Sequence, residues 1–470
     1  MSSMRLHACL VPLLAVASLH AQADRYELGL RLRGYERQLA RVEDPALRSA
    51  SYDQLNRAVQ AFFSMNPRAV AVAIDAARAA LEPAPADTDT RWARSLQLVC
   101  SARLVDASVG SVPVTMGAVW PSDDPVPQGA KVVVHVGPAR EQRFSLEALP
   151  LEAPLDLTDN VPGDHEVTWT VQVGDRVLER RTQGLSVVKD LVARTARLEA
   201  AAGEAPPDSL EGRTLRLHLR MLADMQRSRG EETILPGAWL LTEAERLAAA
   251  VAANTPAFAD APGGQRWLDV PNGKSGTVVR MFAPEGVPAG ERRPVVLALH
   301  GAGGSENLFF DGYGDGEVVD QCKARGWFCI APRGQGFMGG ADLPTLVDTL
   351  AQSWPIDPSR VVMVGHSMGA AAAVAAAVKS PNRYRAVAPL GGGGTARGTG
   401  LGQLPFLVGV GTRDFALQGA RSLNARLEAL GAPTTLREYP DVEHLAIVQI
   451  ALPDVFAFFD RSLAAPPKDR

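Results

Sequence analysis

The pentapeptide Gly365-His366-Ser367-Met368-Gly369 places a serine hydroxyl where it could attack an acyl carbon. An apolar run at residues 361–364 precedes it and an alanine-rich run at 370–373 follows it, so we expect a strand, a sharp turn and a helix. Small flanking residues are required because a nucleophile at such a turn takes a strained backbone and its neighbours approach closely. The pattern predicts that Ser367 is the nucleophile.

A serine hydroxyl reacts only when a base takes its proton, and an acid must orient that base. Where a strand–turn–helix elbow carries the serine, the acid and then the histidine follow along the chain. His444 is the only histidine after Ser367, and Asp414 follows an apolar run that ends in a glycine. Asp441 and Glu443 are rival acids close to His444, and we expect both to be solvated.

The negative oxygen formed during such an attack needs backbone N–H donors. We expect one from Met368, directly after the nucleophile, and one from Ala302 in the run His300-Gly301-Ala302-Gly303-Gly304. Gly301 and Gly303 would let this loop approach the substrate, and His300 would brace it by hydrogen bonding. No Lys-Ser/Thr pair follows, so the run is not a phosphate loop. No His/Asp/Glu cluster has metal-ligand spacing, so we expect no metal.

The elements around these residues alternate between short β-rich runs and helical segments. Two strands without an intervening helix, followed by β–α alternation, predict a mostly parallel α/β sheet covered by helices on both faces. Expected strands lie at residues 267–270, 277–282, 295–300, 327–331, 360–364, 385–390, 405–410 and 434–439, and helices at 343–354, 368–379, 416–430 and 446–459.

In the chain before this region, the spacing of apolar residues changes between helical and strand periodicity. We expect a signal peptide at 1–23, a helical region at 24–90, a small immunoglobulin-like β-sandwich at 91–188, a helical connector at 189–262 and the catalytic domain at 263–470. The first helices could bind a partner, but we favour a scaffold role. The sandwich could bind a polymer or act as a spacer.

The first residues have the layout of an export signal. Arg5 precedes an uncharged, mostly apolar stretch, and Ala21-Gln22-Ala23 is a cleavage site of small residues before Asp24. This predicts export to the periplasm or the exterior, the alternative being a buried first helix. No other stretch is apolar for long enough to span a bilayer, so the mature chain should have no integral membrane segment.

The composition excludes several classes of protein. Of 470 residues, 46% are hydrophobic and 21% charged, as in a globular protein. The net charge is -4, so no basic excess supports nucleic-acid binding. Four cysteines are too few for a disulfide scaffold. Cys322 and Cys329 could form a bridge, but we favour two buried thiols.

Taken together, the elbow, the loop at 300–304, Asp357-Pro358-Ser359-Arg360-Val361, Gly411-Thr412-Arg413-Asp414 and Glu443-His444 resemble the α/β-hydrolase superfamily. Within it, residues 265–465 are similar to secreted polyhydroxybutyrate-depolymerase/feruloyl-esterase-like and dienelactone-hydrolase-like esterases. The resemblance implies ester hydrolysis through an acyl-serine intermediate, without a cofactor. Many members carry a large lid after the sixth strand, whereas only residues 391–404 are available here, so we expect an open cleft.

The leading hypothesis is therefore a secreted serine esterase that acts on small or polymer-attached esters. A serine peptidase of the prolyl-oligopeptidase type shares the catalytic fold, but its N-terminal propeller would need repeated four-stranded blades, and none is visible. A non-catalytic exported binding protein is the third possibility, against which the complete set of Ser367, His444 and Asp414 argues.

Overall fold

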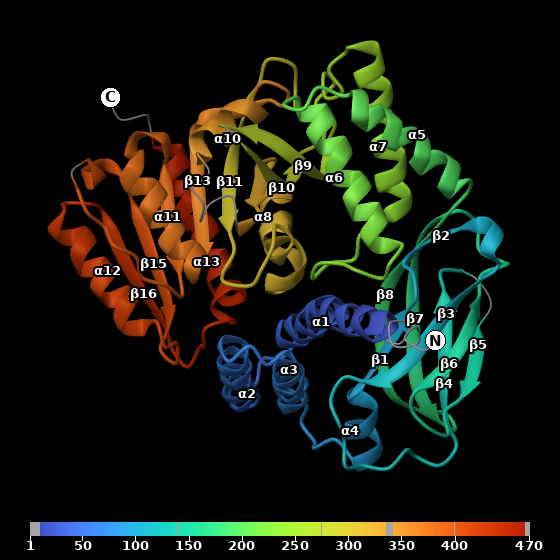
Figure 1. The fold of residues 1–470 in the computed structure, drawn as a ribbon. Helices are drawn as coiled ribbons and strands as arrows, with labels where there is room; N and C mark the ends of the chain where they lie inside the picture. The colour runs from blue at the N-terminus through green and yellow to red at the C-terminus, as the bar shows by residue number, and fades with distance from the viewer. Residues whose placement is uncertain (1–9, 139–140, 274, 335–341, 399, 466–470) are drawn as a thin grey trace, which may run out of the picture.

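A computed structural model describes residues 10–138, 141–273, 275–334, 342–398 and 400–465, with the backbone alone for 10–24. The chain forms N-terminal helices, a β-module, a second group of helices and a C-terminal α/β region (Figure 1). Within these described stretches, no helix is both long enough and apolar enough to cross a bilayer.

The first helices begin where the sequence supplies caps. Asp44, Asn66 and Asp87 each accept a backbone N–H in the first turn of the helix that follows. A proline at the first position of α2 and of α3 presets the backbone for a helix. Residues 25–82 are thus mostly helical, within the helical region predicted at 24–90. The bounds are α1 Leu10–Leu39, α2 Pro45–Phe63, α3 Pro67–Ala80 and α4 Thr88–Arg94.

The β-module consists of two sheets that share one apolar core. A three-stranded sheet has the order β1-β3-β6, and a five-stranded sheet has the order β2-β8-β7-β4-β5. Leu98 and Val114 from the first sheet and Val134 and Trp169 from the second belong to the same buried cluster. The module is thus a small sandwich, as expected. Its strands are β1 Leu96–Cys100, β2 Leu104–Asp106, β3 Ser111–Ala118, β4 Ala130–Val136, β5 Gln142–Ser145, β6 Leu151–Asp156, β7 Gly163–Val173 and β8 Arg176–Val188.

Helices α5 (Leu191–Glu204), α6 (Leu210–Met225) and α7 (Gly237–Ala253) connect the sandwich to the C-terminal region. They are more than a tether, because Leu215 and Leu222 of α6 lie in the same buried cluster as Leu268 and Val279 of the C-terminal sheet.

The C-terminal region is built on an eight-stranded sheet with the order β16-β15-β14-β13-β11-β12-β10-β9. The hairpin β9–β10 is antiparallel and β10 pairs antiparallel with β12, whereas every other neighbouring pair is parallel. The mostly parallel sheet predicted from the sequence is confirmed. Its strands are β9 Gly264–Asn272, β10 Ser275–Ala283, β11 Arg293–Leu299, β12 Phe328–Pro332, β13 Ile356–His366, β14 Ala386–Leu390, β15 Phe406–Gly411 and β16 Thr434–Tyr439.

Helices cover both faces of this sheet because successive side chains of the central strands point to opposite sides. Val295 and Leu297 of β11 belong to the cluster that contains residues of α10, α11 and α12, whereas Val296 and Ala298 belong to the cluster that contains residues of α8 and α13. The bounds are α8 Glu317–Arg325, α10 Leu343–Leu350, α11 Met368–Lys379, α12 Leu417–Ala429 and α13 Ile447–Ala464.

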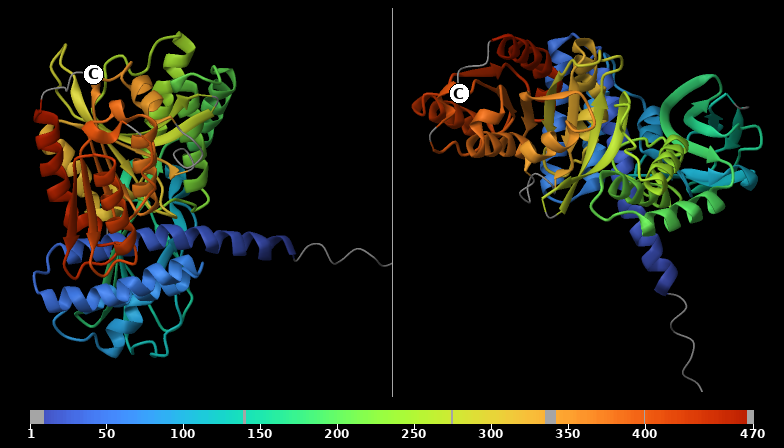
Figure 2. Two further views of the ribbon diagram at one scale, coloured as in Figure 1. Left: turned by 90° about the vertical axis from the view of Figure 1, so that its left-hand side faces the viewer. Right: turned by 90° about the horizontal axis from the view of Figure 1, so that it is seen from above.

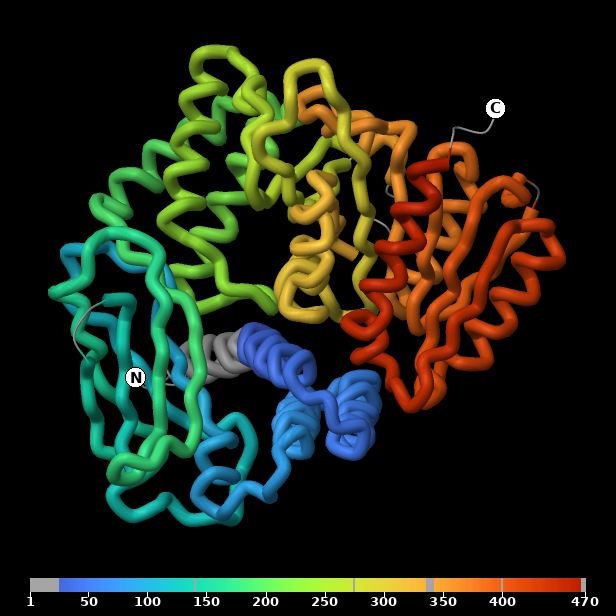
Figure 3. Tube along the Cα trace, turned by 180° about the vertical axis from the view of Figure 1, so that it is seen from behind, coloured from blue at the N-terminus to red at the C-terminus, as the bar shows by residue number. Residues whose placement is uncertain are grey.

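The N-terminal helices pack against the C-terminal region from the α8–α13 side. Tyr35 and Leu39 of α1, Leu55 of α2 and Ile74 of α3 belong to the same buried cluster as Val296 of β11. Helices α1–α3 lie together along one end of the sheet region (Figures 2 and 3). Cys322 of α8 and Cys329 of β12 are buried free thiols in this cluster, as we expected.

Candidate active site

Ser367 sits at the sharp turn between β13 and α11. Its φ is 56° and its ψ is -114°, a region that non-glycine residues enter only under strain. A Cβ on Gly365 would lie 2.2 Å from the carbonyl oxygen of Gly369, and a Cβ on Gly369 would lie 1.9 Å from that of Leu299. The flanking glycines are therefore required by close backbone contact, which is the reason we gave from the sequence.

The side chains of Ser367, His444 and Asp414 form a continuous hydrogen-bonded chain. The Oγ of Ser367 lies 3.0 Å from Nε2 of His444, and Nδ1 of His444 lies 2.9 Å from Oδ1 of Asp414. A carboxylate only accepts, so Nδ1 carries the proton and Nε2 accepts from the serine hydroxyl. Asp414 and His444 are 4% and 3% exposed, so water does not compete for the bond between them, whereas Ser367 is half-buried and faces the cavity.

The three residues come from three separate strand ends. Ser367 follows β13, Asp414 follows β15 and His444 follows β16. Parallel strands bring their carboxyl ends to one edge of the sheet, which is where open α/β sheets carry their sites. The oxygen Oδ1 of Asp414 also accepts the N–H of Ala416 at 2.7 Å, which fixes the carboxylate against His444.

The two rival acids take other roles. Asp441 is exposed and accepts from Arg413 at 3.2 Å, as expected of a solvated residue. The expectation that Glu443 is solvated is wrong, because Glu443 is fully buried and accepts the N–H groups of Leu445 and Ala446. Burial raises the pKa of Glu443 to about 7. This carboxylate holds the backbone at the start of α13, directly after His444.

The glycine-rich loop after β11 faces the serine. Gly301, Ala302 and Gly303 line the same cavity as Ser367 and His444. Nδ1 of His300 lies 2.7 Å from the carbonyl oxygen of Gly301, and burial lowers the pKa of His300, so a neutral ring braces the loop. Met368 is the first residue of α11, where backbone N–H groups lack partners within the helix.

A buried chain of polar groups joins this loop to His444, and no sequence motif predicts it. The N–H of Gly301 donates to the hydroxyl of Tyr313, and that hydroxyl donates to Nδ1 of His366 at 2.6 Å. Nε2–H of His366 then donates to the backbone carbonyl of His444 at 2.8 Å. Burial, and then the neighbouring His444, hold the pKa of His366 well below its usual value, so its ring is neutral.

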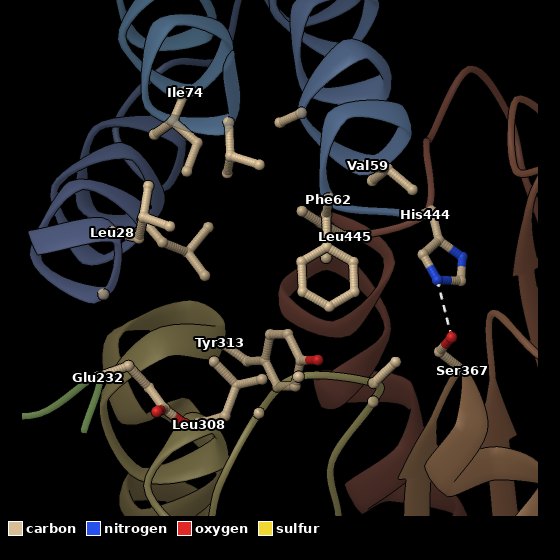
Figure 4. Close-up of a pocket in the computed structure, with 18 of the residues that line it drawn as sticks. Leu28, Val59, Phe62, Ile74, Glu232, Leu308, Tyr313, Ser367, His444 and Leu445 are labelled. Atoms are coloured by element: carbon tan, nitrogen blue, oxygen red, sulfur yellow. Dashed lines mark hydrogen bonds between the residues drawn. The ribbon is translucent and has the colours of Figure 1, made fainter. Parts of the chain in front are cut away.

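A cavity of about 300 Å³ opens from Ser367 and His444 (Figure 4). One wall is the loop at 301–304, and the opposite wall consists of side chains from α1, α2 and α3. The cavity is half open to solvent, so the expectation of an open cleft is met only in part. The loop after β14 is indeed short, but N-terminal helices far away in the sequence cover the site instead. No sequence signal showed which surface their apolar faces would contact.

Comparisons with known proteins agree with this architecture. Residues 295–469 match the family model described as the alpha/beta hydrolase family. A search of curated protein sequences finds no match.

Three of the solved structures that match part of this chain are the following. A ferulic acid esterase is 15% identical, with a TM-score of 0.36, and the alignment covers 42% of this chain and 97% of that protein. An S-formylglutathione hydrolase from Agrobacterium tumefaciens is 18% identical, with a TM-score of 0.35, covering 43% and 97%. The feruloyl esterase module from Clostridium thermocellum is 13% identical, with a TM-score of 0.33, covering 44% and 90%.

Proposed function

We propose that this chain, whose residues 295–469 form an α/β-hydrolase domain, is a serine hydrolase that cleaves carboxylic esters. The observation that carries the proposal is the hydrogen-bonded chain of Ser367, His444 and Asp414 at the mouth of a cavity. The strained elbow at Ser367 supports it further, because such strain persists only where the surrounding structure holds it in place.

In the first half of the reaction, Oγ of Ser367 attacks the ester carbonyl while Nε2 of His444 takes its proton. The N–H groups of Met368 and Ala302 stabilise the negative oxygen. His444 then returns the proton to the leaving alcohol, which leaves an acyl group on Ser367.

In the second half, His444 activates a water molecule that hydrolyses the acyl-serine, and Asp414 stabilises the imidazolium in both halves. Each of these steps uses groups of the chain and water, so the proposal includes no cofactor.

The peptidase alternative gains no specific support. The described residues before the α/β region form helices and one two-layer sandwich, whereas a prolyl-oligopeptidase-type enzyme needs a propeller of repeated blades. The intact hydrogen-bonded chain at Ser367 argues against a non-catalytic binding protein.

We also propose that the protein is exported, because residues 1–23 have the layout of a signal peptide. The mature chain would begin at Asp24. Edman sequencing of the protein recovered from outside the cytoplasm should start at this residue, and an intact N-terminus would contradict export by this signal.

The test of the activity replaces one serine. Wild-type protein should hydrolyse p-nitrophenyl esters and react with a fluorophosphonate probe, whereas Ser367→Ala should lose labelling and several orders of magnitude in kcat. Ser359→Ala is the matched control, because Ser359 is exposed and lies on the same strand β13. Full ester turnover by Ser367→Ala would overturn the assignment, and turnover of peptides but not esters would favour the peptidase.

A further inference from the structure

We infer that helices α1–α3 form the acyl-binding pocket of this site, and that its substrates are esters of medium-length apolar acyl groups. The inference rests on the proposed ester hydrolysis and goes beyond it by naming the substrate class. It also gives the N-terminal helices a role in selectivity, where the sequence favoured a scaffold.

The cavity wall opposite the catalytic residues is apolar. Leu28 of α1, Val59 and Phe62 of α2 and Ile74 of α3 point into the cavity, and Leu308 closes it from the α/β region (Figure 4). Each side chain offers only hydrocarbon to a bound group. The hydrophobic effect therefore favours an apolar chain in this space over water.

Helix α2 touches the loop that would bind the oxyanion. A Cβ on Gly303 would lie 2.3 Å from Cζ of Phe62, so the ring lies directly against the glycine backbone. With φ at +74°, Gly303 also has a conformation that favours glycine. Because the contact is immediate, the pocket is continuous with the carbonyl site.

The far end of the cavity is closed by a paired carboxylate. Glu232 accepts Nε–H of Arg25 at 2.9 Å and the backbone N–H of Ser305 at 2.6 Å. Both carboxylate oxygens of Glu232 already accept hydrogen bonds, so a hydrocarbon chain that reached this end would meet a charged group instead of an apolar surface. An acyl chain that reached it would have to disrupt the ion pair, which sets an upper limit on chain length.

The geometry assigns the pocket to the acyl group, because the alcohol leaves on another side. His444 must protonate the leaving alcohol, and its ring lies 4.3 Å from the ring of Phe415. Phe415 is 63% exposed and packs edge-on against Phe63, which is 58% exposed. Phe63 also lines the cavity, whereas Phe415 lies outside the cavity lining. The alcohol therefore departs past Phe415, while the acyl chain extends along the loop at 301–304 into the cavity.

The volume sets the expected chain length. A cavity of about 300 Å³ holds about ten water-sized groups at about 30 Å³ each. Each buried methylene raises kcat/KM by a factor of about four. Activity should thus rise along a series of p-nitrophenyl esters from acetate to octanoate, and fall beyond decanoate.

The experiment compares this series in wild type, Leu28→Trp and Leu30→Trp. The first variant fills the cavity from α1 and should lower kcat/KM for octanoate at least tenfold more than it lowers kcat/KM for acetate. Leu30 lies on the same helix outside the cavity lining, so Leu30→Trp should match wild type. If Leu28→Trp does not fold, judged by circular dichroism, Leu28→Ala should move the optimum toward longer chains.

Several outcomes would overturn the inference. A wild type that is labelled but prefers acetate over octanoate would remove the acyl pocket and leave the serine hydrolase intact. A chain-length optimum among alkyl acetates instead of acyl esters would assign the cavity to the alcohol. Equal losses on acetate and octanoate in Leu28→Trp would also contradict it. Absence of both labelling and turnover of every ester would refute the proposed function itself.

Discussion

Replacing Tyr313 by phenylalanine tests whether the buried polar chain behind the site positions His444. The hydroxyl of Tyr313 accepts from the N–H of Gly301 and donates to His366, whose other nitrogen donates to the carbonyl of His444. Tyr313 is 1% exposed, and only a water molecule inside the cavity that it lines could take the place of the lost oxygen. The substitution therefore leaves two buried polar groups without a partner.

The magnitude follows from these two groups. A buried donor or acceptor without a partner costs about 1–3 kcal/mol, so the free energy of unfolding should fall by about 2–6 kcal/mol in Tyr313→Phe. His366 would also lose the bond that fixes its ring, and with it the anchor on the backbone of His444. Because displacements of about 1 Å at a reacting group can lower rates about 100-fold, kcat should fall about 10–100-fold with little change in KM.

Two measurements check this prediction, namely urea unfolding and steady-state kinetics on a p-nitrophenyl ester. Tyr384→Phe is the control, since the buried hydroxyl of Tyr384 has no hydrogen-bond partner among the described residues. That variant should retain wild-type kcat and unfold within about 0.5 kcal/mol of wild type. A Tyr313→Phe protein with wild-type kcat would refute the positioning role, and equal destabilisation by both variants would refute the energetic reasoning.

Two further predictions concern buried carboxyl groups. Asp414→Asn should lower kcat by about 10⁴ because the amide favours the wrong tautomer of His444, and a loss of less than tenfold would show that another acid orients the ring. Burial raises the pKa of Glu36 to about 8, so the folded state holds a proton that the unfolded chain releases near pH 4.5. Its stabilising contribution is complete below about pH 4.5 and is lost as the pH rises to about 8, by about 1.4 kcal/mol per pH unit. Thermal unfolding of Glu36→Gln should show a weaker loss of stability over this range than wild type, and parallel pH profiles would contradict the assignment.

The sequence predicts Ser367 as the nucleophile because the residues that shape its turn are neighbours in the chain. The strand before Ser367, the glycines beside it and the helix after it are consecutive in the chain, and each constrains the same turn. His444 could be selected because no other histidine follows the nucleophile. Asp414 was identified by its place after β15, and the hydrogen bond to His444 agrees with that choice.

What the sequence does not predict depends on contacts between distant segments. The apolar residues of α1 and α2 indicate a buried face but not the surface that covers it. The sequence therefore does not predict that these helices form a wall of the cavity at Ser367. Tyr313 lies in a segment without a motif, and its role depends on His366 lying behind it. Glu443 was expected to be solvated because a charged residue in a loop usually is, whereas it is fully buried and close enough to the buried Glu36 of α1 to raise the pKa of that residue.

Helices α1–α3, which line the cavity, and the α/β region, which carries Ser367, share one apolar core. Tyr35 of α1 and Leu55 of α2 are completely buried in the same apolar cluster as Val296 and Phe459 of the α/β region. Separating these helices from the sheet would return this surface to water, at about 1.5–3 kcal/mol for each large apolar side chain exposed. The helices that line the cavity are therefore held in place by the same packing that stabilises the sheet. Selectivity supplied by α1–α3 can consequently be rigid, unlike that of a hinged lid, and the acyl pocket should exist before substrate arrives.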